Sequence, residues 1–271
     1  MALTPFQARI LRLLAAQRKA GAESYVAGGV ALNVLIASPR RSRDIDLFHD
    51  TEEALAATWA RDRRLLEAEG FAIRLVREAP SFVEAVVSRG PERTAMQWAR
   101  DSAYRFFPLV ADDLMGLALH PFDLATNKIL AMAGRLEVRD WIDVLSCDLK
   151  LQPFGYLAWA ACGKDPGYNP RSLLAAARRL HYSQAEVDTL DFDGEPPDAA
   201  GLGARWHDVL AAASALVGLL PPAEAGKCVI TPSCDLFRGN ESELADALGR
   251  GAVGFHEGRI GGSWPRFVAV R

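Results

Sequence analysis

The first twenty residues have the spacing of an amphipathic helix. Ile10 and Leu14 lie one turn apart on an apolar stripe between polar positions. Thr4 is a residue type that caps helices, and Pro5 suits the first helical position. Gly21 can end the helix in the left-handed conformation. We therefore predict a helix from Thr4 to Gly21.

Strands and helices alternate through the rest of the first half of the chain. Apolar residues recur there at spacings of two or of three to four residues. Several of the strands follow one another directly, which predicts an α+β fold: a mixed sheet with helices packed on it. The expected strands are 24–27, 45–48, 72–76, 82–88 and 93–98, and the expected helices are 30–36 and 52–69.

The second half is predicted to be mostly helical. The expected helices are 123–134, 138–149, 171–180, 184–190 and 204–219, followed by strands at 228–231 and 267–270. Two consecutive prolines at 221–222 mark a boundary. We therefore expect an α/β core at 1–118, a helical region at 119–222 and a small β-containing extension at 223–271.

Composition excludes some classes of protein. The chain has 271 residues, of which 50% are hydrophobic and 24% charged, the profile of an ordered globular protein. A net charge of −3 gives no overall basic footprint for nucleic acid. The four cysteines form no metal-like pair, so we expect reduced thiols and a cytoplasmic location. No apolar run reaches the roughly 20 residues of a membrane span, so no membrane partner is expected.

The stretch RRSRDIDLF carries the first candidate chemistry. On a strand, Asp44 and Asp46 project from the same face, while Ile45 and Leu47 project from the other. Two carboxylates repel each other unless a cation lies between them, and Mg²⁺ takes such oxygen ligands together with substrate phosphates. The alternative is an exposed edge strand with solvated carboxylates.

Two glycines precede this strand. Gly28 and Gly29 lie between the predicted strand 24–27 and the predicted helix 30–36. Glycine at a helix N-terminus lets a phosphate approach the backbone N–H groups, although an ordinary tight turn uses glycine as well. The order of strand, glycines, helix and paired aspartates favours a phosphate site followed by its metal site.

These residues carry a resemblance to a known family. The segment GGVALNVLIASPRRSRDIDLF resembles the nucleotidyltransferase superfamily of the DNA polymerase β type. Within it, the segment is most similar to the AbiEii/AbiGii toxins of type IV toxin–antitoxin systems. A second segment, DLATNKILAMAGRLEVRDWIDVL, fits the same family. The matching residues are Gly28, Gly29, Ala31, Leu32, Arg41, Ser42, Arg43, Asp44, Asp46, Phe48, Lys128, Arg139, Asp140 and Asp143.

The resemblance implies an enzyme that moves a nucleoside monophosphate from an NTP to a hydroxyl group. It implies Mg²⁺ or Mn²⁺ as cofactor and ATP, GTP or CTP as donor. It also implies an RNA acceptor such as the 3′ end of tRNA, and a cognate antitoxin protein as partner. The implied catalytic residues are Asp44, Asp46, Lys128 and Asp140, of which Asp44 and Asp46 hold the metal. The implied nucleotide-binding residues are Gly28, Gly29, Arg41, Ser42, Arg43, Lys128 and Asp143.

The second segment can also be interpreted from its residues alone. Lys128 lies on the apolar face of a helix that we expect Asp123 to cap, either as a charge for a triphosphate or as a lysine at the edge of the core. Asp140 and Asp143 share a helix face. Either one of them orients Lys128 or Arg139, or they form a surface pair with Arg139 or act as acids at the helix start that the helix dipole favours.

One expected carboxylate is missing. Metal-dependent nucleotidyl transfer usually uses a third acid from a neighbouring strand, and Gln97 occupies the expected place. Either Glu84 or Asp101 takes the role, or two carboxylates suffice, or the protein binds nucleotide without transferring it. Besides this non-catalytic nucleotide-binding protein, an antibiotic-modifying nucleotidyltransferase remains as an alternative.

Overall fold

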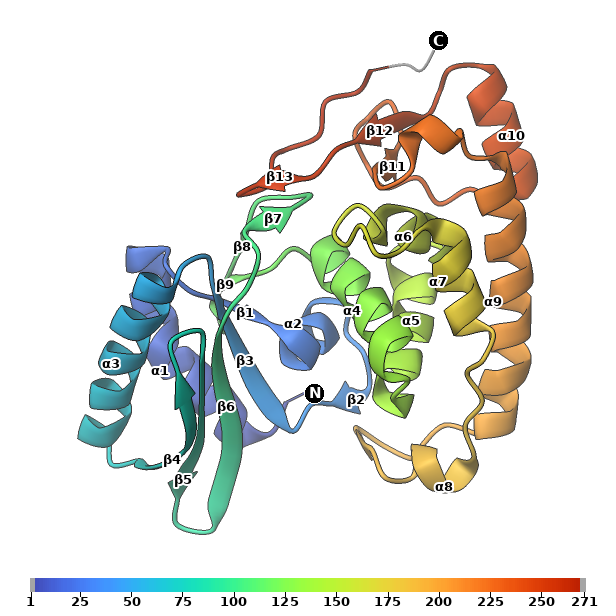
Figure 1. Cartoon of the computed structure of the whole chain (residues 1–271). Coiled ribbons are helices and arrows are strands. Elements are labelled where there is room, and N and C mark those ends of the chain that lie inside the picture. The colour runs from blue at the N-terminus through green and yellow to red at the C-terminus, as the bar shows by residue number, and fades with distance from the viewer. Residues whose placement is uncertain (1–2, 269–271) are drawn as a thin grey trace. The chain divides into compact units, whose positions relative to one another are not determined.

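The computed structural model describes residues 3–268, which fold as two compact units (Figure 1). The sheet unit comprises residues 3–103 and 109–120. The helical unit comprises residues 104–108 and 121–268. The chain therefore leaves the sheet unit for five residues, returns to it, and leaves again before the helices begin.

The sheet unit is built on one seven-stranded mixed sheet. Its strand order is β4-β5-β6-β3-β1-β9-β8. The helices are α1 (Pro5–Gly21), α2 (Gly28–Leu35) and α3 (Glu52–Ala68). The strands are β1 (Tyr25–Ala27), β2 (Arg40–Arg41), β3 (Asp44–His49), β4 (Ala72–Ala79), β5 (Phe82–Arg89), β6 (Glu92–Arg100), β8 (Val110–Asp112) and β9 (Gly116–Ala118).

The middle of this sheet has one fully buried face. Strand β3 pairs antiparallel with β1 and parallel with β6. Ile45, Leu47 and Trp98 on these strands have no exposed surface. Helices α1 and α3 both contact β6, and the ring of Trp59 on α3 lies 4.6 Å from that of Trp98. Burial of this face stabilises the position of β3. The side chains of β3 that reach the surface therefore lie on the opposite face.

Helix α1 has the predicted N-cap at Thr4 and ends at Gly21, but its left-handed cap lies one residue later than predicted. The Thr4 side chain accepts from the Gln7 backbone N–H, and the Gln7 side chain accepts from the Thr4 backbone, which completes a capping box. The expected left-handed glycine at Gly21 is wrong, because Ala22 takes that conformation with φ 52°. Its N–H still donates to the Arg18 carbonyl, so the helix end is satisfied without glycine.

The helical unit contains more elements than the sequence predicted. Its helices are α4 (Pro121–Arg135), α5 (Val138–Lys150), α6 (Phe154–Ala161), α7 (Pro170–Ala177), α8 (Gln184–Val187), α9 (Ala199–Leu219), the 3-10 turn η1 (Pro222–Glu224) and α10 (Glu241–Gly249). Its strands are β7 (Tyr104–Arg105), β10 (Asp191–Phe192), β11 (Cys228–Ile230), β12 (Gly254–His256) and β13 (Arg259–Ile260). Strand β11 pairs with β12, and β13 pairs with β7. The strand expected at 267–270 is absent at 267–268, and 269–270 lie outside the described residues.

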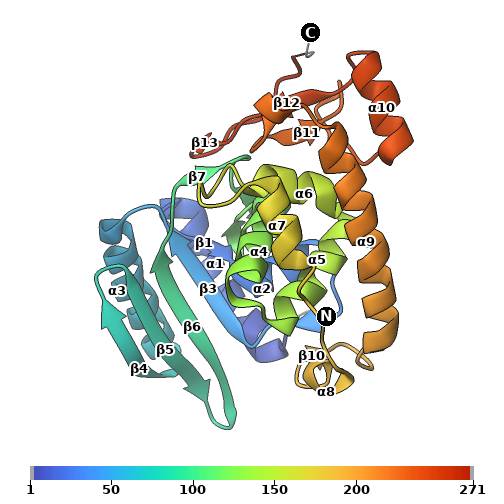
Figure 2. The same ribbon diagram turned by 45° about the vertical axis from the view of Figure 1, so that its right-hand side comes forward.

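Helix α6 is the centre of this unit and was not predicted. Every one of its residues is buried, and it contacts α4, α7 and α9 (Figure 2). The sequence FGYLAWAA has no polar side, so it shows no helical periodicity. The extension beyond Pro221 packs on the same core, since Val229 and Leu244 cluster with Tyr156 and Trp159 of α6.

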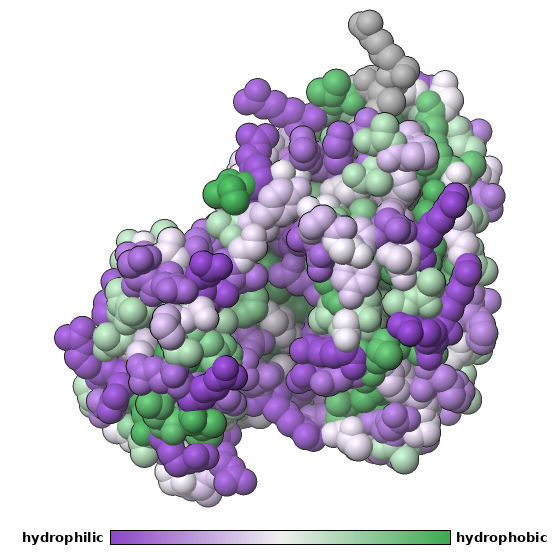
Figure 3. Space-filling view, viewed as in Figure 1, coloured by the Kyte–Doolittle hydropathy of each residue, from purple (hydrophilic) through white to green (hydrophobic). Residues whose placement is uncertain are grey.

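The surface is mixed in character. The face shown in Figure 3 carries hydrophilic side chains over most of its area, with hydrophobic ones in small separate patches. The exposed large hydrophobic residues are Leu75, Val76, Leu136, Leu149, Leu219, Ile260, Trp264 and Val268. Among residues 3–268, no helix has the length and apolar character needed to cross a membrane.

Candidate active site

The paired aspartates lie on β3 as predicted. Burial alternates along the strand: Ile45 and Leu47 have no exposed surface, whereas Asp44 and Asp46 are half-buried. The two carboxylates therefore share the face of the sheet opposite α1 and α3. Because β3 is a central strand with partners on both sides, the interpretation of Asp44 and Asp46 as residues of an edge strand is wrong.

The glycines before helix α2 are fitted to this strand. Gly28 has φ +62°, and a Cβ built on it would lie 1.7 Å from Asp46 Oδ2. A Cβ on Gly29 would lie 2.7 Å from Ser42 Oγ. Helix α2 starts at Gly28 itself rather than at residue 30, and its N-cap is Ala27, whose side chain cannot accept a hydrogen bond. The structure thus brings the glycine pair directly against Asp46.

Hydrogen bonds fix the backbone just before Asp44. Ser42 Oγ donates to Asp44 Oδ1 over 2.8 Å. Gln7 Nε2 donates to the Ser42 carbonyl over 2.9 Å, and Thr94 Oγ1 donates to the Arg43 carbonyl over 3.1 Å. Sequence reasoning found Ser42 but missed Gln7 and Thr94. Gln7 on α1 and Thr94 on β6 are polar residues at positions that are almost fully buried. A polar residue on an otherwise apolar face was therefore the signal available in the sequence.

The three arginines before Asp44 differ in exposure. Arg40 is 3% exposed, and one of its guanidinium nitrogens donates to the Arg41 carbonyl over 3.1 Å. Arg41 is half-buried, whereas Arg43 is exposed. Arg41 and Arg43, for which we predict phosphate contact, are thus the two arginines whose side chains reach the surface. Arg40 instead supports the loop.

Gln97 stands beside Asp46 in the sheet. The parallel pairing of β3 and β6 places their Cα atoms opposite each other, and Glu84 of β5 is the next residue in the same row. Neighbouring strands are about 4.8 Å apart, so Glu84 is roughly 10 Å from Asp46 across the sheet. Asp101 lies beyond the end of β6, where its N–H donates to the His49 carbonyl. Gln97 therefore holds the position next to the paired aspartates.

The donors on this face suit one divalent cation with few protein ligands. No group of three or more His, Cys, Asp or Glu side chains within 3–268 is arranged to hold a metal ion. Asp44 and Asp46 supply two carboxylates, and the missing Cβ at Gly28 lets Asp46 Oδ2 lie against the start of helix α2. Mg²⁺ typically binds one or two carboxylates and completes its shell with water and substrate phosphates. These residues fit that pattern.

The second predicted cluster lies between α4 and α5 of the helical unit. Lys128 Nζ is 3.0 Å from Asp140 Oδ1 and 3.1 Å from Asp143 Oδ2. Both carboxylates are fully buried, and Lys128 is 8% exposed. Arg135 Nε lies 2.6 Å from Asp140 Oδ2. An ammonium group has three N–H donors, of which the two aspartates take two.

The charges of this cluster compensate one another. Burial alone would raise the pKa of Asp140, but the hydrogen bond from Arg135 and the positive charge of Lys128 outweigh it, so its pKa lies below the usual value. Arg139 instead pairs with Glu137 over 2.8 Å. Asp140 and Asp143 are therefore the residues that orient Lys128, and the surface pair with Arg139 is wrong.

Asp123 does not cap the helix of Lys128. Helix α4 begins at Pro121, and the Asp123 carboxylate accepts hydrogen bonds from the backbone N–H groups of Phe106 and Phe107 over 2.8 and 3.0 Å. Lys164 Nζ lies 2.8 Å from the same carboxylate. Asp123 thus links the segment 104–108 to helix α4 within the helical unit.

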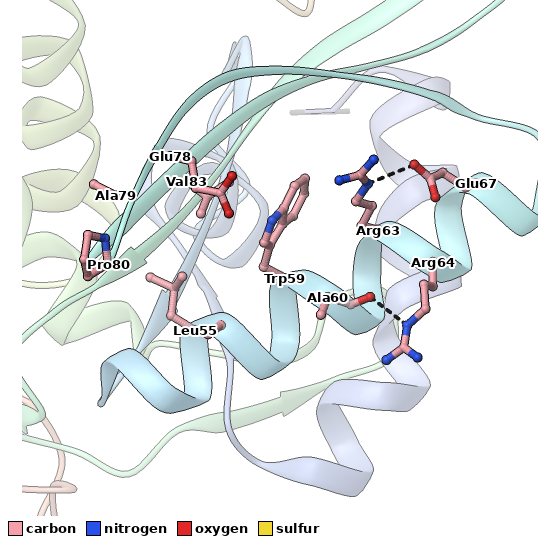
Figure 4. A pocket seen from close by; sticks show the side chains of 11 residues that line it. Leu55, Trp59, Ala60, Arg63, Arg64, Glu67, Glu78, Ala79, Pro80 and Val83 are labelled. Atoms are coloured by element: carbon pink, nitrogen blue, oxygen red, sulfur yellow. Dashed lines mark hydrogen bonds and ion pairs between the residues drawn. The ribbon is translucent and has the colours of Figure 1, made fainter.

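A groove of about 860 Å³ marks the other face of the sheet unit. Figure 4 shows Trp59 projecting from α3 toward Val83 of β5. The arginines on the rim are engaged: Arg63 Nε pairs with Glu67, and Arg64 Nε donates to the Ala60 carbonyl. Since Val83 points to the face opposite its neighbour Glu84, this groove is separate from the face that carries Asp46.

Comparison with known proteins identifies a related fold. The sequence matches no model of a known protein family. A comparison with curated proteins finds no significant match. The structure is similar to JHP933 from Helicobacter pylori, with a TM-score of 0.56 and 14% identity over 80% of this chain and 95% of that one. The chain has the fold of JHP933. This likeness confirms the predicted α+β fold.

A second similar structure is the nucleotidyltransferase toxin MenT4 from Mycobacterium tuberculosis. It has a TM-score of 0.48 and 16% identity, over 80% of this chain and 83% of that one. The fold is inferred from JHP933, because this chain aligns with 95% of that structure.

Proposed function

We propose that the protein is a metal-dependent nucleotidyltransferase that moves a nucleoside monophosphate from an NTP to a hydroxyl acceptor. The observation that carries this proposal is the fit between Gly28 and Asp46. Gly28 has a left-handed φ, and Asp46 Oδ2 fills its Cβ position, so the start of a helix lies against one of two carboxylates on a shared strand face. Phosphate at the helix N-terminus and a cation on the carboxylates would then meet at one place.

The residues of the sheet unit act by positioning. Asp44 and Asp46 would hold Mg²⁺ or Mn²⁺, which when bound neutralises phosphate charge and orients the α-phosphate. The backbone at Gly28 and Gly29 would receive the phosphates. Ser42 orients the Asp44 carboxylate, while Gln7 and Thr94 fix the loop that carries Ser42. The acceptor hydroxyl oxygen bonds to the α-phosphorus and releases its proton to solvent. The bond between the α-phosphorus and the oxygen that bridges to the β-phosphate breaks, and pyrophosphate leaves with that oxygen.

Lys128 is proposed to contact the triphosphate, as the family resemblance implies. Its ammonium group is oriented by Asp140 and Asp143, and Arg135 offsets part of the negative charge. A lysine held in this way would present its positive charge to a phosphate with little further loss of side-chain freedom.

The biological role is proposed from the resemblance alone. It points to a toxin that acts on an RNA acceptor such as the 3′ end of tRNA and is countered by an antitoxin protein. The net charge of −3 does not by itself favour RNA. Small antibiotics with free hydroxyl groups are the competing acceptor class.

A second candidate function is nucleotide binding without transfer. The observation in its favour is the register of Gln97 with Asp46, which puts a neutral amide where a third carboxylate is usual. Gln97 can neither take a proton nor offset the charge of a second cation.

One experiment separates these functions. The protein is titrated with each NTP and Mg²⁺ by calorimetry, and pyrophosphate release is then measured with total RNA, with an aminoglycoside or with no acceptor. Transfer predicts release that depends on one acceptor class. Saturable NTP binding without release from any mixture favours the binding protein, and failure to bind any NTP contradicts both.

A further inference from the structure

The helical unit contains a cavity of about 580 Å³ that belongs to neither candidate cluster. Three aromatic side chains line it: Trp141 from α5, Tyr182 from the loop before α8, and Trp206 from α9. Arg178, His181 and His207 also line it, and both histidines are exposed. The volume lies within the range typical of small-molecule sites.

Two donors lining this cavity are unsatisfied. Trp141 is 2% exposed, and its indole Nε1–H has no hydrogen-bond partner within residues 3–268. The buried hydroxyl of Tyr182 likewise lacks a partner in the described part of the chain. Their rings are neighbours, with centroids 5.2 Å apart. Buried polar groups are nearly always paired, so two adjacent exceptions in one cavity indicate a missing acceptor.

Several other polar groups around the cavity are already hydrogen-bonded. Trp206 Nε1 donates to the Ala177 carbonyl over 3.2 Å, and Arg178 donates to Ser214 Oγ over 2.9 Å. The Asp198 carboxylate accepts from the Gly201 N–H at the start of α9. Trp141 Nε1 and the Tyr182 hydroxyl are thus the buried donors of this lining that lack a partner within residues 3–268.

The chemistry of the lining restricts the ligand. An indole N–H can only donate, so the ligand must present an acceptor to Trp141. Burial, with Asp140, Glu186 and Glu137 nearby, raises the pKa of Tyr182 to about 12, so its hydroxyl keeps its proton at neutral pH. Among the three aromatic residues, Tyr182 is only half-buried, and an accessible aromatic ring favours a flat partner such as a nucleobase.

We propose that this cavity binds the base of a nucleotide, which lies against the half-buried ring of Tyr182 and accepts hydrogen bonds from Trp141 and Tyr182. The nucleotide comes either free from solution or from single-stranded RNA. The assignment does not depend on nucleotidyl transfer, because none of the lining residues belongs to the proposed active site. It adds a second nucleotide site to the protein.

The test uses the full chain carrying Asp44→Ala and Asp46→Ala, which removes the proposed metal site. AMP, GMP, CMP and UMP are titrated without divalent ions, and tryptophan fluorescence and calorimetry report binding. At least one nucleotide is expected to bind at a single site. Trp141→Phe and Tyr182→Phe keep the rings and remove one donor each, so each should weaken binding about tenfold.

The controls separate the possible outcomes. Trp264→Phe changes an exposed tryptophan outside the cavity and should leave affinity unchanged. Inorganic phosphate should not compete. A tetranucleotide that binds more tightly than its mononucleotide identifies RNA as the source, and equal affinity identifies a free nucleotide. No binding of any base at millimolar concentration, or binding that neither Phe variant weakens, overturns the proposal whether or not transfer activity is found.

Discussion

Asp46 Oδ2 occupies the space in which a Cβ on Gly28 would stand, 1.7 Å from the ideal Cβ position. The two residues face each other because β1, which ends at Ala27, pairs antiparallel with β3 and sets Ala27 opposite Asp46. The glycine and aspartate motifs are therefore parts of one packed arrangement.

The first prediction concerns Gly28→Ala. The new methyl group displaces the Asp46 carboxylate and also strains the backbone at φ +62°. We expect the free energy of unfolding to fall by about 3 kcal/mol and Mg²⁺ binding to be lost. Urea titration and calorimetry measure the two effects.

Gly90→Ala is the matched control for this change. Gly90 has φ +60°, and a Cβ there meets nothing within 4 Å. It should lose only about 1 kcal/mol, the contribution of backbone strain, and keep Mg²⁺ binding. Equal losses in the two variants would show that contact with Asp46 is unimportant.

The second prediction concerns Gln97→Glu. A third carboxylate beside Asp46 should lower the free energy of unfolding by about 1 kcal/mol without divalent ions, through charge repulsion. Mg²⁺ should reverse the loss and bind more tightly than to the wild type. Thermal unfolding across a Mg²⁺ series tests this, with Gln97→Leu as the neutral control. If Mg²⁺ stabilises all three proteins equally, Gln97 lies outside the metal site.

The third prediction concerns acid stability. His49 is fully buried, and burial lowers its pKa to about 4, with the charge of Arg18 acting in the same direction. Unfolding returns the group to its ordinary pKa of 6.5, so the unfolded chain binds a proton first as the pH falls. The stabilisation is complete above pH 6.5 and is lost toward pH 4, by about 3 kcal/mol in total.

Urea titrations between pH 7 and pH 4 test this dependence. His49→Leu should flatten the profile, whereas the exposed His207→Gln should leave it as in the wild type. A wild-type slope that His49→Leu does not reduce would mean that other groups cause the acid sensitivity.

The fourth prediction concerns Lys128→Met. Removing the ammonium group leaves Asp140 and Asp143 buried with less positive charge, so the free energy of unfolding should fall by about 3 kcal/mol. Adding Asp143→Asn should restore part of that loss, because it removes the uncompensated carboxylate. If the double variant is as unstable as the sum of the single variants, the pair is not coupled.

The sequence was sufficient where one short segment contains the whole physical pattern. The alternation of Asp44, Ile45, Asp46 and Leu47 predicts a shared carboxylate face, and the structure has it. It failed where distant segments decide the outcome. Gln7 lies far along the chain from the loop that it anchors, so its role could not be predicted.

Other parts of the fold lack a local signal. Helix α6 is buried on every side, which removes the periodicity that identifies a helix. The expected glycine at the end of α1 is replaced by Ala22, since a backbone hydrogen bond to Arg18 is enough to hold that conformation. The pairing of β7 with β13 joins residues too far apart in sequence for any local pattern to predict.

The most direct test of the account is transfer of label from α-³²P NTPs. The wild type, the Asp44→Ala/Asp46→Ala variant and the control Asp113→Ala, which changes an exposed aspartate of the same unit, are each incubated with the four NTPs, Mg²⁺ and total RNA. If Asp44 and Asp46 hold the catalytic metal ion, the wild type and the control give a labelled product. The double variant gives none, and no label is transferred when EDTA is added. Label transfer that survives in the double variant would contradict the central role of Asp44 and Asp46.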